Sequence, residues 1–60
     1  MVGKNVKFWY LNEKRSTIVK TGNIVDKIIQ KSNTAYIIKY MDDDISILRI
    51  VKPDQIINLI

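Results

Sequence analysis

The sequence predicts one all-β domain over residues 1–60, a small five-stranded barrel with a short helical turn near Pro53. The chain has 60 residues and no cysteine, so a single compact domain without disulfides is expected. Twenty residues are valine, isoleucine or threonine, and β-branched side chains favour strands over helices. Apolar and polar residues also alternate in several segments, as they do in half-buried strands.

The first strand is expected at residues 6–10, where the alternation is clear. Val6, Phe8 and Tyr10 share one face, which we assign to the core, and Lys7 and Trp9 share the other. Residues 11–17 are polar and follow neither the strand period nor the helix period, so they are expected to form a loop.

A long second strand is expected at residues 18–30, with an interruption at Gly22 and Asn23. A glycine inside a strand indicates a bulge or a sharp bend. Such a bend would allow one strand to serve two sheets of a small barrel. Residues 31–33 (Lys-Ser-Asn) are expected to form a turn, because serine and asparagine side chains satisfy local backbone groups.

The third strand is expected at residues 34–41, with Tyr36, Ile38 and Tyr40 on one face and Ile37 and Lys39 on the other. Asp42–Asp44 is predicted to be a hairpin turn.

The fourth strand, at residues 45–52, is so apolar that alternation does not identify its inward face. Pro53 ends it, because proline lacks an N–H donor and restrains the residue before it to extended geometry. Pro53 then opens a one-turn helix, and residues 57–60 form a last short strand. A full helix over the tail is the alternative.

Four segments carry a resemblance to known small barrels: Gly3–Phe8, Gly22–Lys27, Ala35–Tyr40 and Ile50–Ile56. In their glycine, apolar and proline positions, they resemble the Src-homology-3-like barrels, the group that includes Tudor and KOW-type modules. The resemblance implies a five-stranded barrel. In layout the chain is also similar to the type II dihydrofolate reductases. Their Val-Gln-Ile-Tyr stretch falls here on residues 49–52 (Arg-Ile-Val-Lys), where the glutamine and the tyrosine are missing.

The chain has few of the residue types that usually carry catalysis, and we expect no enzyme activity, cofactor or metal site. Histidine and cysteine are absent, which removes the usual general base, the thiol nucleophile and the transition-metal ligands. Asp42–Asp44 is the sole carboxylate cluster, and a hard cation is one interpretation of it. The cluster lacks the spaced oxygen ligands of a calcium loop, so a solvated turn is the preferred interpretation.

Charge points instead to a binding surface. The net charge is +4, and residues 1–40 hold eight basic and two acidic residues. Basic side chains neutralise phosphates and aromatic faces stack on bases, the combination used in sequence-tolerant nucleic-acid binding. The predicted nucleic-acid-binding residues are Lys4, Lys7, Trp9, Lys14, Arg15, Lys20, Lys27 and Lys39.

The aromatic residues leave two alternatives open. Trp9 lies opposite Phe8 in the alternation, so it either forms an outward contact surface or covers the open end of the barrel. Tyr36 and Tyr40 are expected to be core residues with their hydroxyl groups at the rim. An aromatic platform or cage for a methylated cation is the other interpretation.

The resulting hypothesis is a non-enzymatic binding module for nucleic acid with little sequence specificity. The alternative is a protein-interaction adaptor or a self-associating structural subunit. Four apolar side chains in the last five residues favour a homo-oligomer through the C-terminal strand, Ile56–Ile60. No apolar run approaches the ~20 residues of a membrane span, and no signal peptide is recognisable, so a cytoplasmic location is expected.

Overall fold

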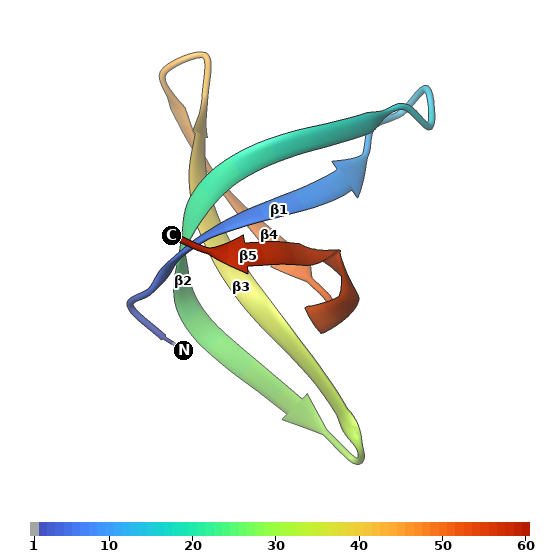
Figure 1. Cartoon of the computed structure of the whole chain (residues 1–60), viewed down its shortest axis with the longest axis vertical. Helices are drawn as coiled ribbons and strands as arrows, with labels where there is room; N and C mark the ends of the chain where they lie inside the picture. The colour runs from blue at the N-terminus through green and yellow to red at the C-terminus, as the bar shows by residue number, and fades with distance from the viewer. Residues whose placement is uncertain (1) are drawn as a thin grey trace.

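The computed structural model describes residues 2–60 as one antiparallel sheet with a single 3-10 turn (Figure 1). The sheet order is β4-β3-β2-β1-β5, and β4 and β5 do not pair with each other, so the described strands form an open sheet. The prediction of an all-β domain with five strands and a helical turn near Pro53 is confirmed. The elements are β1 (Asn5–Leu11), β2 (Thr17–Gln30), β3 (Asn33–Asp42), β4 (Ile45–Val51), η1 (Pro53–Gln55) and β5 (Ile56–Leu59).

The long strand β2 connects the two halves of the sheet, and Figure 1 shows its arc from teal to green. It pairs with β1 from Thr17 to Asn23 and with β3 from Asn23 to Gln30. The strand therefore does serve two partners, and the change occurs at Asn23, inside the predicted interruption.

The irregularity that bends β2 is displaced from its predicted position. The register shift lies between Ile24 and Asp26, and Gly22 keeps regular pairing. Gly22 has another role, because a Cβ atom there would lie 2.6 Å from Ile38 Cγ2 and 2.8 Å from the Lys39 carbonyl oxygen. Glycine at this position allows β3 to approach β2 closely, and the bulge that follows supplies the bend.

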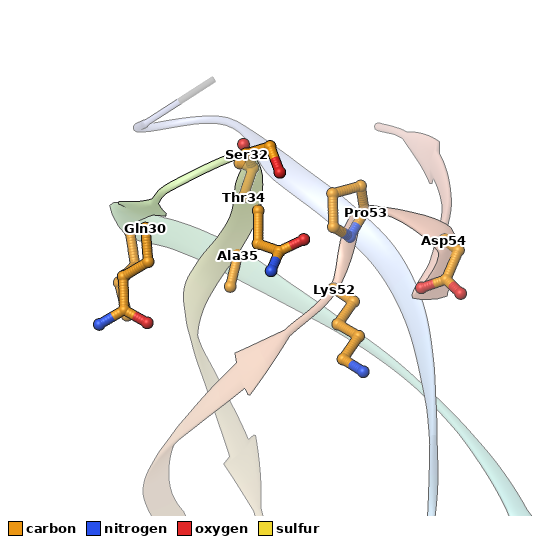
Figure 2. Close-up of a pocket in the computed structure, with 9 residues that line it drawn as sticks. Gln30, Ser32, Thr34, Ala35, Lys52, Pro53 and Asp54 are labelled. Carbon is orange, nitrogen blue, oxygen red and sulfur yellow. The ribbon is translucent and has the colours of Figure 1, made fainter.

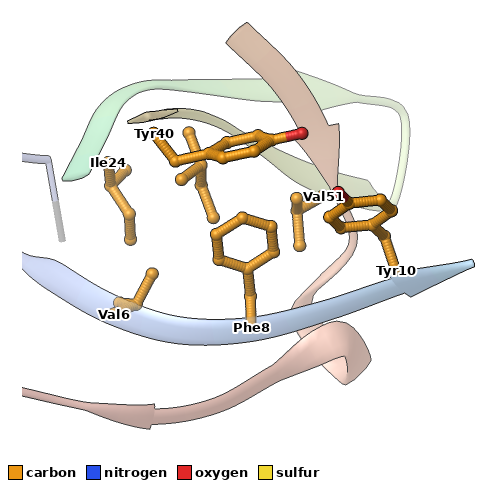
Figure 3. Packing of buried hydrophobic residues seen from close by; sticks show 7 residues of the cluster. Val6, Phe8, Tyr10, Ile24, Tyr40 and Val51 are labelled. Carbon is orange, nitrogen blue, oxygen red and sulfur yellow. The ribbon is translucent and has the colours of Figure 1, made fainter. Parts of the chain in front are cut away.

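The core lies between the two halves of the bent sheet, and we call this side of every strand the core face and the opposite side the outer face. Phe8 is fully buried at its centre, with its ring centroid 5.4 Å from that of Tyr40 and 6.2 Å from that of Tyr10 (Figure 3). The predicted core positions of β1 are confirmed, as are Ile38 and Tyr40 in β3. The buried hydrophobic residues are Val6, Phe8, Tyr10, Ile24, Ile38, Tyr40 and Val51.

Both tight hairpins use non-glycine residues with positive φ. Asp43 and Asp44 have φ of 50° and 65°, the geometry of a two-residue type I′ turn. Asp42 belongs to β3, so the turn is one residue shorter than predicted. In the β2–β3 turn the positive φ of 54° falls on Lys31, whereas Asn33 begins β3.

The tail is a turn followed by a strand, and the helical alternative is wrong. The Gln55 side chain locks the turn, because its Oε1 accepts from the Lys52 N–H at 2.9 Å and its Nε2 donates to the Trp9 carbonyl at 3.1 Å. β5 begins at Ile56, one residue earlier than expected, and pairs with β1. Across residues 2–60, the structure contains no helix with the length and apolar character needed to span a membrane.

Candidate nucleic-acid interface

Lys7 and Trp9 lie side by side on the outer face of β1, as the alternation predicts. The residues between and beside them, Val6, Phe8 and Tyr10, are buried. Lys7 pairs with Thr21 of β2 and Trp9 pairs with Val19, and directly opposed residues of an antiparallel pair share a face. We call the group Lys7, Trp9, Val19 and Thr21 the Trp9 face.

Trp9 is half-buried and lies outside the core cluster. Its backbone is fixed by pairing with Val19 on one side and by the Gln55 side chain on its carbonyl. Lys7 and Thr21 beside it are exposed. The structure therefore places the indole on the outer surface, where one part of it is open to solvent.

The loop at one end of the Trp9 face carries Lys14 and Arg15, and Asn12 organises it. The Asn12 Oδ1 accepts from the backbone N–H groups of both Lys14 and Ser16 at 2.9 Å. Arg15 takes a φ of 59°, and its N–H donates to the Asn12 carbonyl at 2.9 Å. Both cations are exposed, so a defined loop presents them to solvent.

The opposite end of the face carries Lys39 and, before β1, Lys4. Lys39 pairs with Asn23, which pairs with Asn5, so the three residues form one row on the outer face. The Asn23 Nδ2 donates to the Asn5 Oδ1 at 3.1 Å, so the two asparagine side chains are in contact. Lys4 is exposed beside this row, and its carbonyl accepts from the Ile24 N–H at 2.9 Å.

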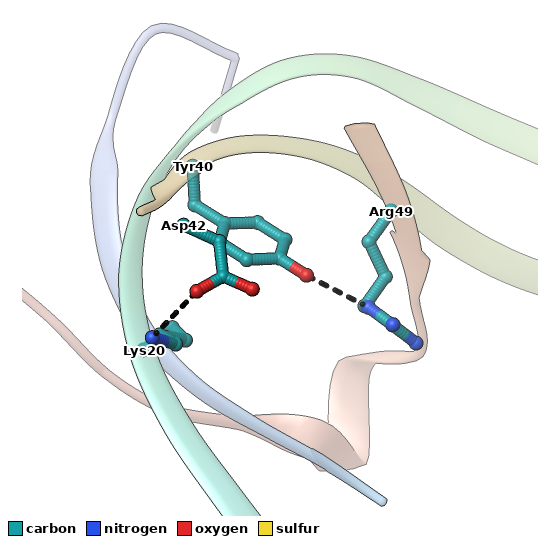
Figure 4. A network of polar contacts seen from close by, with 4 residues as sticks. All are labelled: Lys20, Tyr40, Asp42 and Arg49. Atoms are coloured by element: carbon teal, nitrogen blue, oxygen red, sulfur yellow. Dashed lines mark hydrogen bonds and ion pairs between the residues drawn. The ribbon is translucent and has the colours of Figure 1, made fainter. Parts of the chain in front are cut away.

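Two of the predicted binding residues lie elsewhere. Lys20 pairs with Phe8 and therefore belongs to the core face, where its Nζ lies 3.5 Å from the Asp42 Oδ1 (Figure 4). Lys27 pairs with Tyr36, and Tyr36 pairs with the buried Val51. Lys27 therefore also belongs to the core face. The structure thus separates Lys20 and Lys27 from the other six predicted residues.

Arg49 is an ordered cation that sequence reasoning missed. Its guanidinium carbon lies 3.9 Å from the centroid of the Tyr10 ring, and its Nε donates to the Tyr40 hydroxyl at 3.3 Å (Figure 4). A hydrogen bond with Tyr40 and burial raise the pKa of Tyr10 above its ordinary value. Arg49 covers the aromatic end of the core with its planar group, a packing role that suits arginine.

The remaining surface features offer no chemistry of their own. A shallow pocket of about 620 Å³ lies between the β2–β3 turn and η1, with Thr34 and Ala35 on one side and Lys52 and Pro53 on the other (Figure 2). Asp42, the last residue of β3 before the acidic turn, is paired with Lys20. Within residues 2–60, no group of three or more histidine, cysteine or acidic residues is placed to hold a metal ion.

No family model, no curated protein and no solved structure matches the chain.

Proposed function

We propose that this chain is a non-enzymatic module that binds nucleic acid, with little sequence specificity, through the Trp9 face and the cations at its two ends. One observation carries the proposal: a lysine and the single tryptophan are neighbours on an exposed face that holds no acidic side chain. The outward positions of β1 and of the first half of β2 are Asn5, Lys7, Trp9, Leu11, Thr17, Val19, Thr21 and Asn23.

The dimensions and the residue types suit a phosphate backbone. From Thr17 to Asn23 the face is about 20 Å long at ~3.3 Å per residue. Along the axis of a B-form duplex, where each strand carries one phosphate per ~3.4 Å, that length spans about six phosphates of one strand. Five cations lie on the Trp9 face or at its ends: Lys4, Lys7, Lys14, Arg15 and Lys39. Four of them are lysines, which act as point charges and lack the bidentate guanidinium of arginine, so contacts to the phosphate backbone should dominate. The half-exposed indole of Trp9 offers a stacking surface for a base.

The proposed frame is a Src-homology-3-like barrel. Its support is the order of elements: a hairpin with a polar loop, a bent second strand, two tight hairpins, and a 3-10 turn before a last strand that returns to β1. In such a frame the Trp9 face lies on β1 and β2, and β5 pairs with β1 beside it. The proposed interface therefore rests on hydrogen-bonded strands, which limits the conformational entropy lost on binding.

Trp9 fluorescence provides the test, because Trp9 is the sole tryptophan of the sequence. The protein is titrated with short single-stranded and duplex oligonucleotides at low and moderate salt. We expect quenching that weakens strongly with salt. The variant Lys14→Glu/Arg15→Glu, altered in an exposed loop, should abolish the binding and leave the fold intact. Unchanged fluorescence with both oligonucleotides at low salt would refute the proposal.

A protein-interaction or self-associating module is the second candidate, and β5 is the observation that favours it. β5 is an edge strand, and Ile57, Leu59 and the following Ile60 are exposed. Exposed apolar side chains on an edge strand are suited to pairing with another chain. Such binding would change little with salt and would tolerate the Lys14→Glu/Arg15→Glu change, so the same titration series separates the two candidates.

A further inference from the structure

The opposite edge of the sheet, β4, has a regular and unprotected backbone. It lies at the end of the strand order, and each of its seven residues has a partner in β3 without a register shift. It contains no lysine, proline or bulge, features that often block pairing at natural edge strands. Its one charged residue, Arg49, is held against Tyr10 and Tyr40. β4 therefore offers a second chain a complete strand to pair with.

The β3–β4 turn determines which backbone groups are offered. It has two residues, Asp43 and Asp44, so Asp42 and Ile45 flank it as a hydrogen-bonded pair. Backbone groups alternate in direction along an antiparallel strand, so every second residue from Ile45 onward bonds to β3. The residues whose N–H and C=O groups point away from the sheet are Ser46, Leu48 and Ile50.

Two of these residues also carry exposed apolar side chains. Leu48 is 65% exposed and Ile50 is 64% exposed, both on the outer face, whereas Arg49 between them points to the core face and bonds to Tyr40. We propose that β4 pairs antiparallel with β4 of a second copy of this chain, on a two-fold axis at Leu48. The pairing joins the two sheets into one.

This register satisfies every free group of the strand. Leu48 meets Leu48 of the second copy, and Ser46 meets Ile50 in both directions. Each of these pairs exchanges two hydrogen bonds, about six in total. Moving the axis to Arg49 would place two guanidinium groups opposite each other, and like charges in opposed positions destabilise a strand pair. Moving it to Ile47 would leave Ile50 opposite a turn residue, with fewer bonds.

Charge at the strand ends explains why the occupant is a second copy. With the axis at Leu48, Asp44 of each copy lies opposite Lys52 of the other. Both residues are exposed, and neither forms an ion pair among the described residues. The chain thus carries, at the two ends of one edge, the charges that complement its own antiparallel copy. A two-fold contact of this kind closes on itself, so it produces a dimer and not a filament.

Amide hydrogen exchange followed by NMR tests the proposal on the unmodified protein. Between ~10 µM and ~1 mM, mass action should convert monomer to dimer. The amides of Ser46, Leu48 and Ile50 should then exchange more slowly, while those of Ile47 and Arg49 should be protected at both concentrations. A monomer mass by sedimentation equilibrium at every concentration would overturn the proposal. A dimer whose newly protected amides lie in β5 would also overturn it.

Two variants locate the contact. Leu48→Lys places two ammonium groups on the axis and should raise the dissociation constant at least about tenfold. Its matched control is Leu59→Lys, which makes the same change at a 53% exposed leucine of the other edge strand and should have no effect. Lys52→Glu should weaken the dimer, and the additional change Asp44→Asn should restore part of the affinity. Equal effects of Leu48→Lys and Leu59→Lys would contradict the proposed edge. The dimer leaves the Trp9 face open, so its outcome is independent of nucleic-acid binding.

Discussion

Replacing Lys7 with glutamine gives the sharpest test of the proposed interface. Lys7 is exposed beside Trp9, so Lys7→Gln removes one phosphate contact from the centre of the Trp9 face. The matched control is Lys27→Gln, because Lys27 is also exposed and lies in the row of Tyr36, away from that face. Both variants lower the net charge from +4 by one, so any effect of total charge is common to both.

The magnitude follows from the number of cations at the interface. Lys4, Lys7, Lys14, Arg15 and Lys39 lie on the Trp9 face or at its ends. If all five contact a single strand, the slope of log K against log salt is about −3.5, so a fourfold rise in salt lowers the affinity about 130-fold. Lys7→Gln should reduce the slope to about −2.8, so the same rise in salt lowers the affinity only about 50-fold.

The assay is the Trp9 fluorescence titration with a single-stranded oligonucleotide, at ~50 mM and ~200 mM salt. We expect Lys27→Gln to keep the slope of the unmodified protein and Lys7→Gln to make the slope less steep. Equal slopes for the two variants, both below that of the unmodified protein, would show that the overall charge of the protein attracts the ligand and that the Trp9 face has no special part.

Three further predictions concern the fold. Gly22→Ala puts a Cβ atom 2.6 Å from Ile38 Cγ2, so the free energy of unfolding should fall by about 1–3 kcal/mol, and an unchanged urea midpoint would contradict this packing. Phe8→Ala should cost about 3–5 kcal/mol. Because a domain of this size has only about 3–9 kcal/mol of stability, the thermal midpoint should fall by more than about 10 °C, and an unchanged melting curve would refute the expectation. The pKa of Tyr10 is raised in the folded state by its hydrogen bond with Tyr40 and by burial, so its contribution to stability is complete below pH 10.0 and is lost above it. Between about pH 9 and about pH 11, urea midpoints should fall more for the unmodified protein than for Tyr10→Phe.

The core faces of β1 and β3 could be predicted because one face of each strand is consistently apolar and the other interrupted by lysine. β4 gave no such signal, since the outward Leu48 and Ile50 are as apolar as the inward Ile47 and Val51. Its orientation follows from the two-residue turn at Asp43 and Asp44, which sets the register with β3. Ile45 follows the turn and pairs with Asp42, which has the parity of the buried Tyr40, so counting in twos from Ile45 places Ile47 and then Arg49 on the core face.

Part of the candidate site could also be predicted from the alternation of apolar and polar residues. Alternation correctly places Lys7 and Trp9 on one face, because hydrophobic burial fixes the orientation of β1. A lysine in a strand does not by itself show which face it occupies. Lys20 has the parity of the buried Ile24, and its long side chain extends to the edge of the core and reaches Asp42. The bend in β2 also separates Lys27 from the first half of the strand, and no local pattern reveals the direction of a bend.

The pairing of β5 with β1 determines how the fold responds to force. β5 runs antiparallel to β1, and the N–H of Ile60 donates to the carbonyl of Asn5 at 2.9 Å, so the two ends of the fold lie at the same end of one strand pair. Tension applied through Asn5 and Ile60 would act across that pair and open its hydrogen bonds one after another, as a zipper opens. Strands loaded from opposite ends must instead break their bonds together. The module would therefore yield at low force when it is pulled through Asn5 and Ile60, whereas Trp9, paired deeper in the sheet, would keep its position until the β1–β5 contact is lost.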